Sequence, residues 1–275
     1  MPAEPPELPV PSDRDERVSA AGGGDVSFAV VSMSERAADG DDAGYLRWHM
    51  LDHLPEQYRI DGLRWGQRWR STDACRAARV AEAEPFDRVD HVVTYLFGGA
   101  GEGPVDAALD TFFELGGALR AAGRMPVALP RVLVSGWEVV EKRASDRTLV
   151  GAAVVPWRPA RGVYVIVDEL GPDLPPLDDT PPDILPAYGA TDDRLDRLVA
   201  VDGVAGAWTY RDGHARHRRL ESCSGCRLTI CHLDGDPVAT GLALGELLLE
   251  HHRADRTLPL FAAPFEVVQP WSWER

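Results

Sequence analysis

The sequence predicts an α+β protein made of two tandem ferredoxin-like units, each with the element order β-α-β-β-α-β. Hydrophobic patterns predict the same six elements twice along the chain. I-D-G-L-R-W-G-Q-R-W-R at Ile60 aligns without gaps with V-D-G-V-A-G-A-W-T-Y-R at Val201, and G-P-V at Gly103 matches D-P-V at Asp236, each opening a helix. Repetition at this period indicates two fused copies of one fold.

The first unit is placed at residues 25–150. It follows an acidic, proline-rich segment, 1–24, that we expect to be a disordered tail. Asp41 or Asp42 is positioned to cap the first helix, and Pro55 is expected to end it. The predicted elements are a strand at 26–33, the helix at 41–55, strands at 60–70 and 90–99, a helix at 104–123 and a strand at 132–141.

The second unit is placed at residues 160–275, with the boundary near 144–160. A proline-rich stretch, 171–186, falls inside it. Since each unit covers one sheet face with helices, its other face must be buried, and two such faces packed together form a barrel-like interior within one chain. The predicted elements are a strand at 161–168, a helix within 183–201, strands at 203–211 and 226–233, a helix at 237–254 and a strand at 261–268.

Composition and charge exclude several classes of partner. The 275 residues contain 29 basic and 44 acidic side chains, a net charge of −15, which disfavours nucleic acid and anionic membranes. No apolar run approaches the roughly 18–20 residues of a membrane span, and the N-terminus lacks the features of a signal peptide. Four cysteines do not form a disulfide framework. We expect a cytoplasmic protein with a small-molecule substrate, either a monomer with pseudo-dimeric halves or a homodimer.

The helix at 41–55 carries the side chains best suited to chemistry. His49 and His53 lie one turn apart at the edge of its apolar stripe, where burial and a neighbouring carboxylate shift a histidine pKa. We predict an acid/base site with His53 favoured over His49 as the base, and with Asp52 or Tyr45 orienting the ring. The alternative is that both histidines are structural.

Two strands supply further candidate residues. In the strand at 60–70, Trp65 and Trp69 share one face and are predicted to form a flat wall for a planar substrate, while the opposite face is cationic and includes Arg68. In the strand at 90–99, His91 and Tyr95 share a face and are candidate proton donors or polar anchors. Core packing is the alternative for these aromatic residues.

Two consecutive segments, Tyr45–Pro55 and Ile60–Arg70, are similar to a known family. They resemble the W-H-x-x-x-H-x-P and P-G-x-x-x-x-x-R-Y segments of the EthD-like branch of the dimeric α/β barrel superfamily. That superfamily includes cofactor-free monooxygenases, polyketide cyclases, lactone isomerases and dehydratases, and relatives of the wider fold bind haem. The resemblance implies a pocket between sheet and helices with His49 or His53 as acid/base. The matching helix of the second unit has no histidine, so we expect one working pocket.

Two other clusters of reactive or charged residues lie in the second unit. Cys223-Ser-Gly-Cys226 with Cys231 and His232 suggests zinc, but adjacent strand residues point to opposite faces, so we predict no metal; a redox pair or an ordinary loop remain the alternatives. The basic segment 212–219 is predicted to be a solvated hairpin loop, with anion binding as the alternative.

These observations predict a cofactor-free isomerase, cyclase or dehydratase, of lyase or isomerase type, acting on a small planar or polyketide-like substrate. One alternative is a cofactor-free monooxygenase of the same fold. Another is a non-catalytic small-molecule or haem-binding module. Motifs for nucleotide cofactors, catalytic triads and zincins are missing from the sequence.

Overall fold

The computed structural model describes residues 26–37, 42–99, 103–125, 128–169, 193–255, 259–269 and 271, without the side chains of 251–255. The tail predicted for 1–24 and the proline-rich stretch 171–186 therefore lie outside the described residues. Within those ranges, no helix combines the length and the apolar character needed to cross a bilayer.

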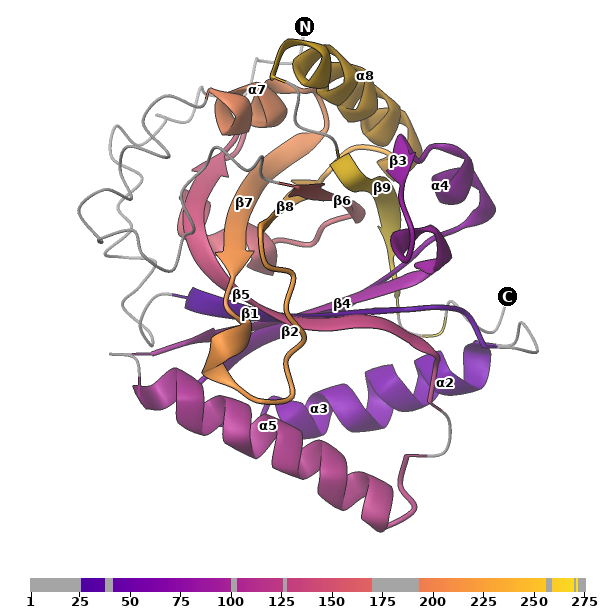
Figure 1. The fold of residues 1–275 in the computed structure, drawn as a ribbon, viewed down its shortest axis with the longest axis vertical. Helices are drawn as coiled ribbons and strands as arrows, with labels where there is room; N and C mark the ends of the chain where they lie inside the picture. Colours follow the sequence, from indigo (N-terminus) through magenta and orange to yellow (C-terminus); the bar gives the residue numbers. More distant parts are fainter. Residues whose placement is uncertain are drawn as a thin grey trace, which may run out of the picture.

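Eight antiparallel strands close into a barrel, shown in Figure 1. Their order around the barrel is β2-β4-β1-β5-β7-β8-β6-β9, and β9 returns to β2. All eight predicted strands are present, which confirms the mixed α+β class. They are β1 (Val26–Ser34), β2 (Leu63–Arg70), β4 (His91–Gly98), β5 (Arg131–Ala144), β6 (Gly162–Glu169), β7 (Val204–Asp212), β8 (Cys226–Leu233) and β9 (Pro259–Val267).

The two halves of the barrel meet at seams of unequal length. Strand β5 pairs with β7 from Trp137 to Ala144, whereas β2 and β9 pair only at Trp69 with Val267 and at Arg70 with Glu266. Strand β5 extends past its predicted end because its first part pairs with β1 and its last part with β7. Within each half the strands have the same relative order, β2-β4-β1-β5 and β7-β8-β6-β9.

The barrel interior is a packed core. Its largest buried side chains are Trp69, Trp137, Trp208, Tyr210, Phe261 and Phe265. Strand residues alternate in direction, so the side chains between those of the core point outward and form two further apolar clusters, one on each half. The described side chains thus fill the interior of the barrel.

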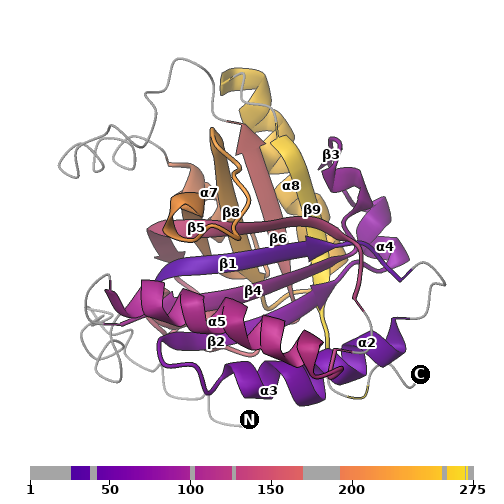
Figure 2. The same cartoon turned by 60° about the horizontal axis from the view of Figure 1, so that its bottom comes forward.

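Helices cover the outer faces of the two halves, as Figures 1 and 2 show. Helix α5 (Gly103–Ala121) and the helix beginning at Ala43 lie over the first half, and α7 (Arg194–Ala200) and α8 (Pro237–Asp255) over the second. These helices were predicted from the sequence. Short elements were not: α4 (Asp73–Ala77), β3 (Ala81–Glu82) at the edge of β9, and 3₁₀ turns at Phe86–Arg88, Ala152–Trp157 and His214–Arg216.

The histidine-bearing helix changes its geometry in the middle. It runs as α2 (Ala43–Trp48), a π-helical turn (His49–His53) and α3 (Leu54–Gln57). The prediction that Pro55 ends this helix is wrong. In the π turn the Leu54 N–H bonds to the His49 carbonyl, and this wider turn relieves the clash that a proline ring makes with the carbonyl four residues earlier.

Candidate functional site

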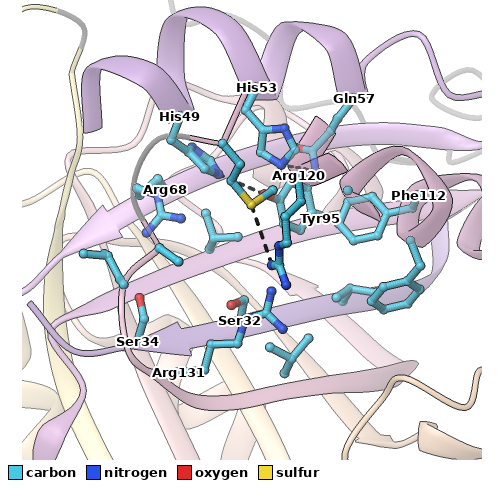
Figure 3. Close-up of a pocket in the computed structure, with 18 of the residues that line it drawn as sticks. Ser32, Ser34, His49, His53, Gln57, Arg68, Tyr95, Phe112, Arg120 and Arg131 are labelled. Atoms are coloured by element: carbon cyan, nitrogen blue, oxygen red, sulfur yellow. Dashed lines mark hydrogen bonds between the residues drawn. The ribbon is translucent and has the colours of Figure 1, made fainter. Parts of the chain in front are cut away.

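A cavity of about 470 Å³ lies between the outer face of the first-half strands and the helices α2, α3 and α5. Figure 3 shows His49, His53 and Gln57 projecting into it from the helix, with Arg68 beside His49 and with Ser32 and Ser34 on the strand opposite. Its charged and polar lining consists of Ser32, Ser34, Tyr45, His49, His53, Gln57, Arg68, Tyr95, Arg120, Arg131 and Arg219.

The central polar contact joins His49 to Tyr95. Nε2 of the imidazole lies 2.9 Å from the phenol oxygen, and both side chains are buried. Burial lowers the pKa of His49 well below its ordinary value, and the positive charge of Arg68 lowers it further. Burial also raises the pKa of Tyr95. Both groups are therefore neutral near pH 7, and each can give or take a proton through one hydrogen bond.

His53 lies next to this pair. Its ring is stacked on Trp48, with centroids 4.8 Å apart and planes 10° from parallel, and it lies 5.7 Å from the ring of His49. Its Nε2 is 3.1 Å from the side-chain nitrogen of Gln57. Burial lowers the pKa of His53 to about 4, with Arg68 adding to the effect and Glu56 opposing it. This second imidazole is also neutral near pH 7.

Several buried polar atoms around the cavity have no hydrogen-bond partner among the described residues. They are Nδ1 of His49, Nδ1 of His53, Oε1 of Gln57, and Nε and Nη1 of Arg68. Each such atom costs about 1–3 kcal/mol of folding free energy when left unpaired. At the wall of a cavity, such atoms are placed where a ligand can supply the missing partners.

Of the two residues predicted to orient the histidine ring, Tyr45 lines the cavity and Asp52 does not. Tyr45 lines the cavity, stacks on the ring of His49 at 5.9 Å, and accepts a hydrogen bond of 2.9 Å from Nη2 of Arg68. Asp52 is exposed and does not line the cavity. The side chains that contact the imidazole nitrogens are Tyr95 and Gln57.

The predicted tryptophan wall lies elsewhere. Trp65 and Trp69 face the barrel interior, where both pack beside His232. A register shift between Leu63 and Trp65 turns Leu63 outward and leaves the two tryptophans inward. The aromatic side chains that line the cavity with the histidines are instead Tyr45, Trp48, Tyr95, Phe112 and Phe113.

Two polar residues beside the cavity do not line it. His91 lies on the same side of β4 as Tyr95, as predicted, but its Nε2 is held 2.8 Å from Asp42. Asp42 precedes the helix without a side-chain cap, because its carboxylate also accepts the backbone N–H of Ala37. Asp42 therefore does not fulfil the predicted capping role, and Asp41, the other predicted cap, lies outside the described residues.

Arginines are the site residues that the sequence analysis missed. Arg68 belongs to the cationic face of the strand at 60–70, and Arg219 to the basic segment 212–219, so both had a signal in the sequence. For Arg120 from α5 and Arg131 from β5, the sequence offered no such signal. The lining contains four arginines and no aspartate or glutamate.

The second half lacks the same side chains at matching positions. In the gap-free alignment Arg68 corresponds to Thr209 and Gly66 to Ala207. Gly66 pairs with Tyr95 across β2 and β4, and Ala207 pairs with Cys231 across β7 and β8, so Cys231 occupies the position of Tyr95. In the described part of this half, the outer face is a buried apolar cluster that includes Tyr164, Leu198 and Leu244.

The cysteines do not form a metal centre in the described part of the chain. Cys231 faces the helices and His232 faces the barrel interior, which confirms that these neighbours point to opposite faces. Cys223 and Cys226 are free thiols in a tight turn closed by a 2.9 Å backbone hydrogen bond between them. Across the described ranges, no group of three or more His, Cys, Asp or Glu side chains is placed to hold a metal ion.

Comparisons with known proteins give only distant likenesses. No family model and no curated protein sequence matches the chain. A solved structure named "putative monooxygenase", from Fusobacterium nucleatum subsp. nucleatum, has a TM-score of 0.49 and 7% identity, covering 90% of this chain and 94% of its own. One named "putative chlorite dismutase" has a TM-score of 0.49 and 12% identity, with coverages of 89% and 95%. A mutant chlorite dismutase from Candidatus Nitrospira defluvii, in complex with cyanide, has a TM-score of 0.48 and 8% identity, with coverages of 92% and 95%. Because all three TM-scores are below 0.5, these similarities give no information about the function of the chain.

Proposed function

We propose that this chain is an acid/base enzyme that moves a proton on a small planar organic substrate, as an isomerase, cyclase or dehydratase does. The observation that carries the proposal is the hydrogen bond between His49 and Tyr95 in a cavity lined by otherwise unpartnered imidazole nitrogens. A neutral imidazole is the usual general base near pH 7, and a neutral phenol is a matching general acid.

The contacts favour His49 for the proton-accepting role. With Nε2–H donating to Tyr95, Nδ1 of His49 has a free lone pair that takes a proton from a substrate carbon. Tyr95 then gives its hydroxyl proton to a substrate oxygen and receives the Nε2 proton in exchange. The result is a proton shift from a substrate carbon to an oxygen several bonds away along a conjugated system, in which every proton is accounted for. His53 contacts an amide, which does not relay protons, so we assign it a supporting role.

The walls of the cavity support a planar substrate. Trp48, Phe112 and Phe113 present aromatic surfaces, and about 470 Å³ falls within the range typical of small-molecule sites. Flat rings stack favourably on such surfaces. A cofactor-free monooxygenase would begin with the same proton abstraction, so dependence of the product on O₂ separates the two reactions.

We also infer that the chain is a tandem duplication of one ferredoxin-like unit, divided as 25–150 and 160–275, in the manner of a dimeric α/β barrel. The shared strand order of the halves and the alignment of Ile60 with Val201 support this. Since each half buries the bare sheet face of the other, the barrel is complete within one chain. A monomer in sedimentation experiments is the expected result.

The side chains around the cavity do not match the pattern of a haem-binding histidine. An axial histidine presents one ring nitrogen to iron while the other donates to a carbonyl or carboxylate. Here Nε2 of each histidine is engaged, by Tyr95 and by Gln57, and each Nδ1 has no partner in the described structure. Neither partner is the carbonyl or carboxylate oxygen that supports an axial histidine, so this arrangement does not fit a haem ligand. A Soret band on adding haem, lost in a His49→Gln variant, would overturn this conclusion.

The proposal is tested by proton exchange, which does not require the overall reaction to be known. A panel of planar enolisable aromatic ketones and keto acids is incubated in D₂O, and deuterium incorporation is followed by NMR. His49→Gln is expected to lower the exchange rate about 10²–10⁴-fold. His214→Gln, in a loop away from the cavity, is the matched control. A wild-type protein that exchanges no member of the panel, or an exchange rate unchanged by His49→Gln with His53→Gln, would contradict the proposal.

A further inference from the structure

We infer that the substrate carries a carboxylate group and that Arg68, a buried residue of the cavity lining, binds it. The inference rests on the proposed function in that the same cavity holds the substrate, and it names the chemical class of that substrate. Arg68 is only 3% exposed and lines the cavity. Nη2 donates to Tyr45, while Nε and Nη1 are buried and have no hydrogen-bond partner in the described part of the chain.

A buried arginine without a carboxylate is unusual in so acidic a chain. The second half of the barrel shows the ordinary arrangement: buried Arg194 lies 2.7 Å from Asp168, which is fully buried. The lining around Arg68 contains no acidic side chain, although the chain has 44 of them. The Tyr45 ring, whose centroid lies 4.8 Å from the guanidinium carbon, offsets part of the charge of Arg68, and the cavity lining supplies no carboxylate. Because a buried charge without a counter-charge is costly, a ligand carboxylate is the group that this site lacks.

Three more arginines lie where the cavity opens to solvent. Arg120, Arg131 and Arg219 are exposed lining residues, and none pairs with a carboxylate in the described structure. Figure 3 shows Arg120 and Arg131 near Ser32, between the helices and the strand. In a protein of net charge −15, this local positive field guides an anion toward the buried arginine.

A carboxylate fits the guanidinium of Arg68 better than a phosphate does. The two oxygens of a carboxylate match the planar fork of a guanidinium, and one carboxylate carries the single negative charge that Arg68 requires. A phosphate dianion would need further buried positive charge, and the other lining arginines are exposed. Ser32 and Ser34 on β1 add hydroxyl groups to the lining, and Trp48 and Phe112 offer surfaces for the attached ring.

Binding of a carboxylate at Arg68 also changes the basicity of His49 and His53. The positive charge of Arg68 contributes to the lowered pKa values of His49 and His53. A carboxylate beside the guanidinium offsets that charge, so both pKa values rise when the ligand is bound. The imidazoles thus become stronger bases when a substrate is present.

The test compares benzoate with benzamide, and 2-naphthoate with 2-naphthamide, by isothermal titration calorimetry. Each pair has nearly the same shape and differs in charge. The wild-type protein is expected to bind the carboxylate at least about 10-fold more tightly than the amide, which corresponds to about 1.4 kcal/mol. Arg68→Met is expected to abolish this preference, and Arg68→Lys, which keeps the charge without the fork, to keep part of it.

Matched variants separate the inference from the proposed function. Arg64→Met, on the same strand but outside the cavity lining, should keep the carboxylate preference. The variant with His49→Gln and His53→Gln should also keep it while losing deuterium exchange, so binding and proton transfer can fail independently. Equal or absent binding of both members of each pair, a preference retained in Arg68→Met, or inorganic phosphate displacing benzoate at equal concentration would overturn the inference.

Discussion

Nε2 of His49 and the phenol oxygen of Tyr95 lie 2.9 Å apart and join the π-helical turn of the first helix to strand β4. This contact spans two elements that are 46 residues apart in the sequence. It pairs two neutral groups at the wall of a cavity, which makes it the centre of the proposed chemistry.

Replacing Tyr95 by phenylalanine should slow deuterium exchange by about 10²-fold or more, because the proton relay loses its hydroxyl. The lost hydrogen bond should also cost about 1 kcal/mol of unfolding free energy, measured by urea denaturation. Tyr58→Phe removes a comparable 2.6 Å hydrogen bond to the Gly66 carbonyl away from the cavity lining. It should show a similar loss of stability with exchange unchanged, and equal exchange by both variants would refute the relay.

Stability should fall as the pH drops from about 6.5 to 4. His53 has a pKa of about 4 in the folded protein, below the ordinary 6.5, so the unfolded chain binds the proton first. Protonation in this window therefore favours unfolding, by up to about 3 kcal/mol for a shift of this size. Urea denaturation at pH 7 and pH 4.5 should show a smaller pH dependence for His53→Gln. His214→Gln, at a partly exposed position outside the cavity lining, is the control for the substitution itself.

Arg68→Met and Arg194→Met should change stability in opposite directions. Removing the unpaired buried charge of Arg68 should raise the unfolding free energy by about 1–3 kcal/mol, since Met fills similar space without a desolvated charge. Removing Arg194 leaves buried Asp168 short of its partner at 2.7 Å and should cost about 3 kcal/mol. Chemical denaturation of both variants measures the difference. A large loss of stability in Arg68→Met would show that the guanidinium has a structural role instead.

Gly66→Ala should disturb the site through Tyr95, which lies opposite Gly66 across β2 and β4. An added Cβ would approach Leu54 Cδ1 to 2.8 Å and Tyr95 Cδ1 to 3.1 Å, so the Tyr95 ring has to shift. We expect a loss of about 1–3 kcal/mol in stability and slower deuterium exchange. Gly44→Ala, in helix α2 with open space at the Cβ position, is the control and should be neutral or stabilising. The second half carries Ala207 opposite the smaller Cys231, consistent with this limit on volume.

The sequence by itself determined the elements and the histidine pair. Alternation and helical periodicity are local properties of a chain, so they identified the eight barrel strands and the helices that end near Gly123 and Asp255. The spacing of His49 and His53 likewise placed both imidazoles on one face of a helix. The end of that helix was misjudged, because the π turn that accommodates Pro55 is not visible in residue spacing.

Only the tertiary structure decided which face of each strand meets the cavity and which charges lack partners. The two faces of a strand are equivalent until the covering helices are known, so Trp65 and Trp69 were assigned to the site although they pack in the barrel interior. Burial and the position of counter-charges depend on residues far apart in the chain. That is why Arg68 could be seen as one of several cations in the sequence, but as a buried, unpaired cation only after folding had brought β2, the first helix and α5 together.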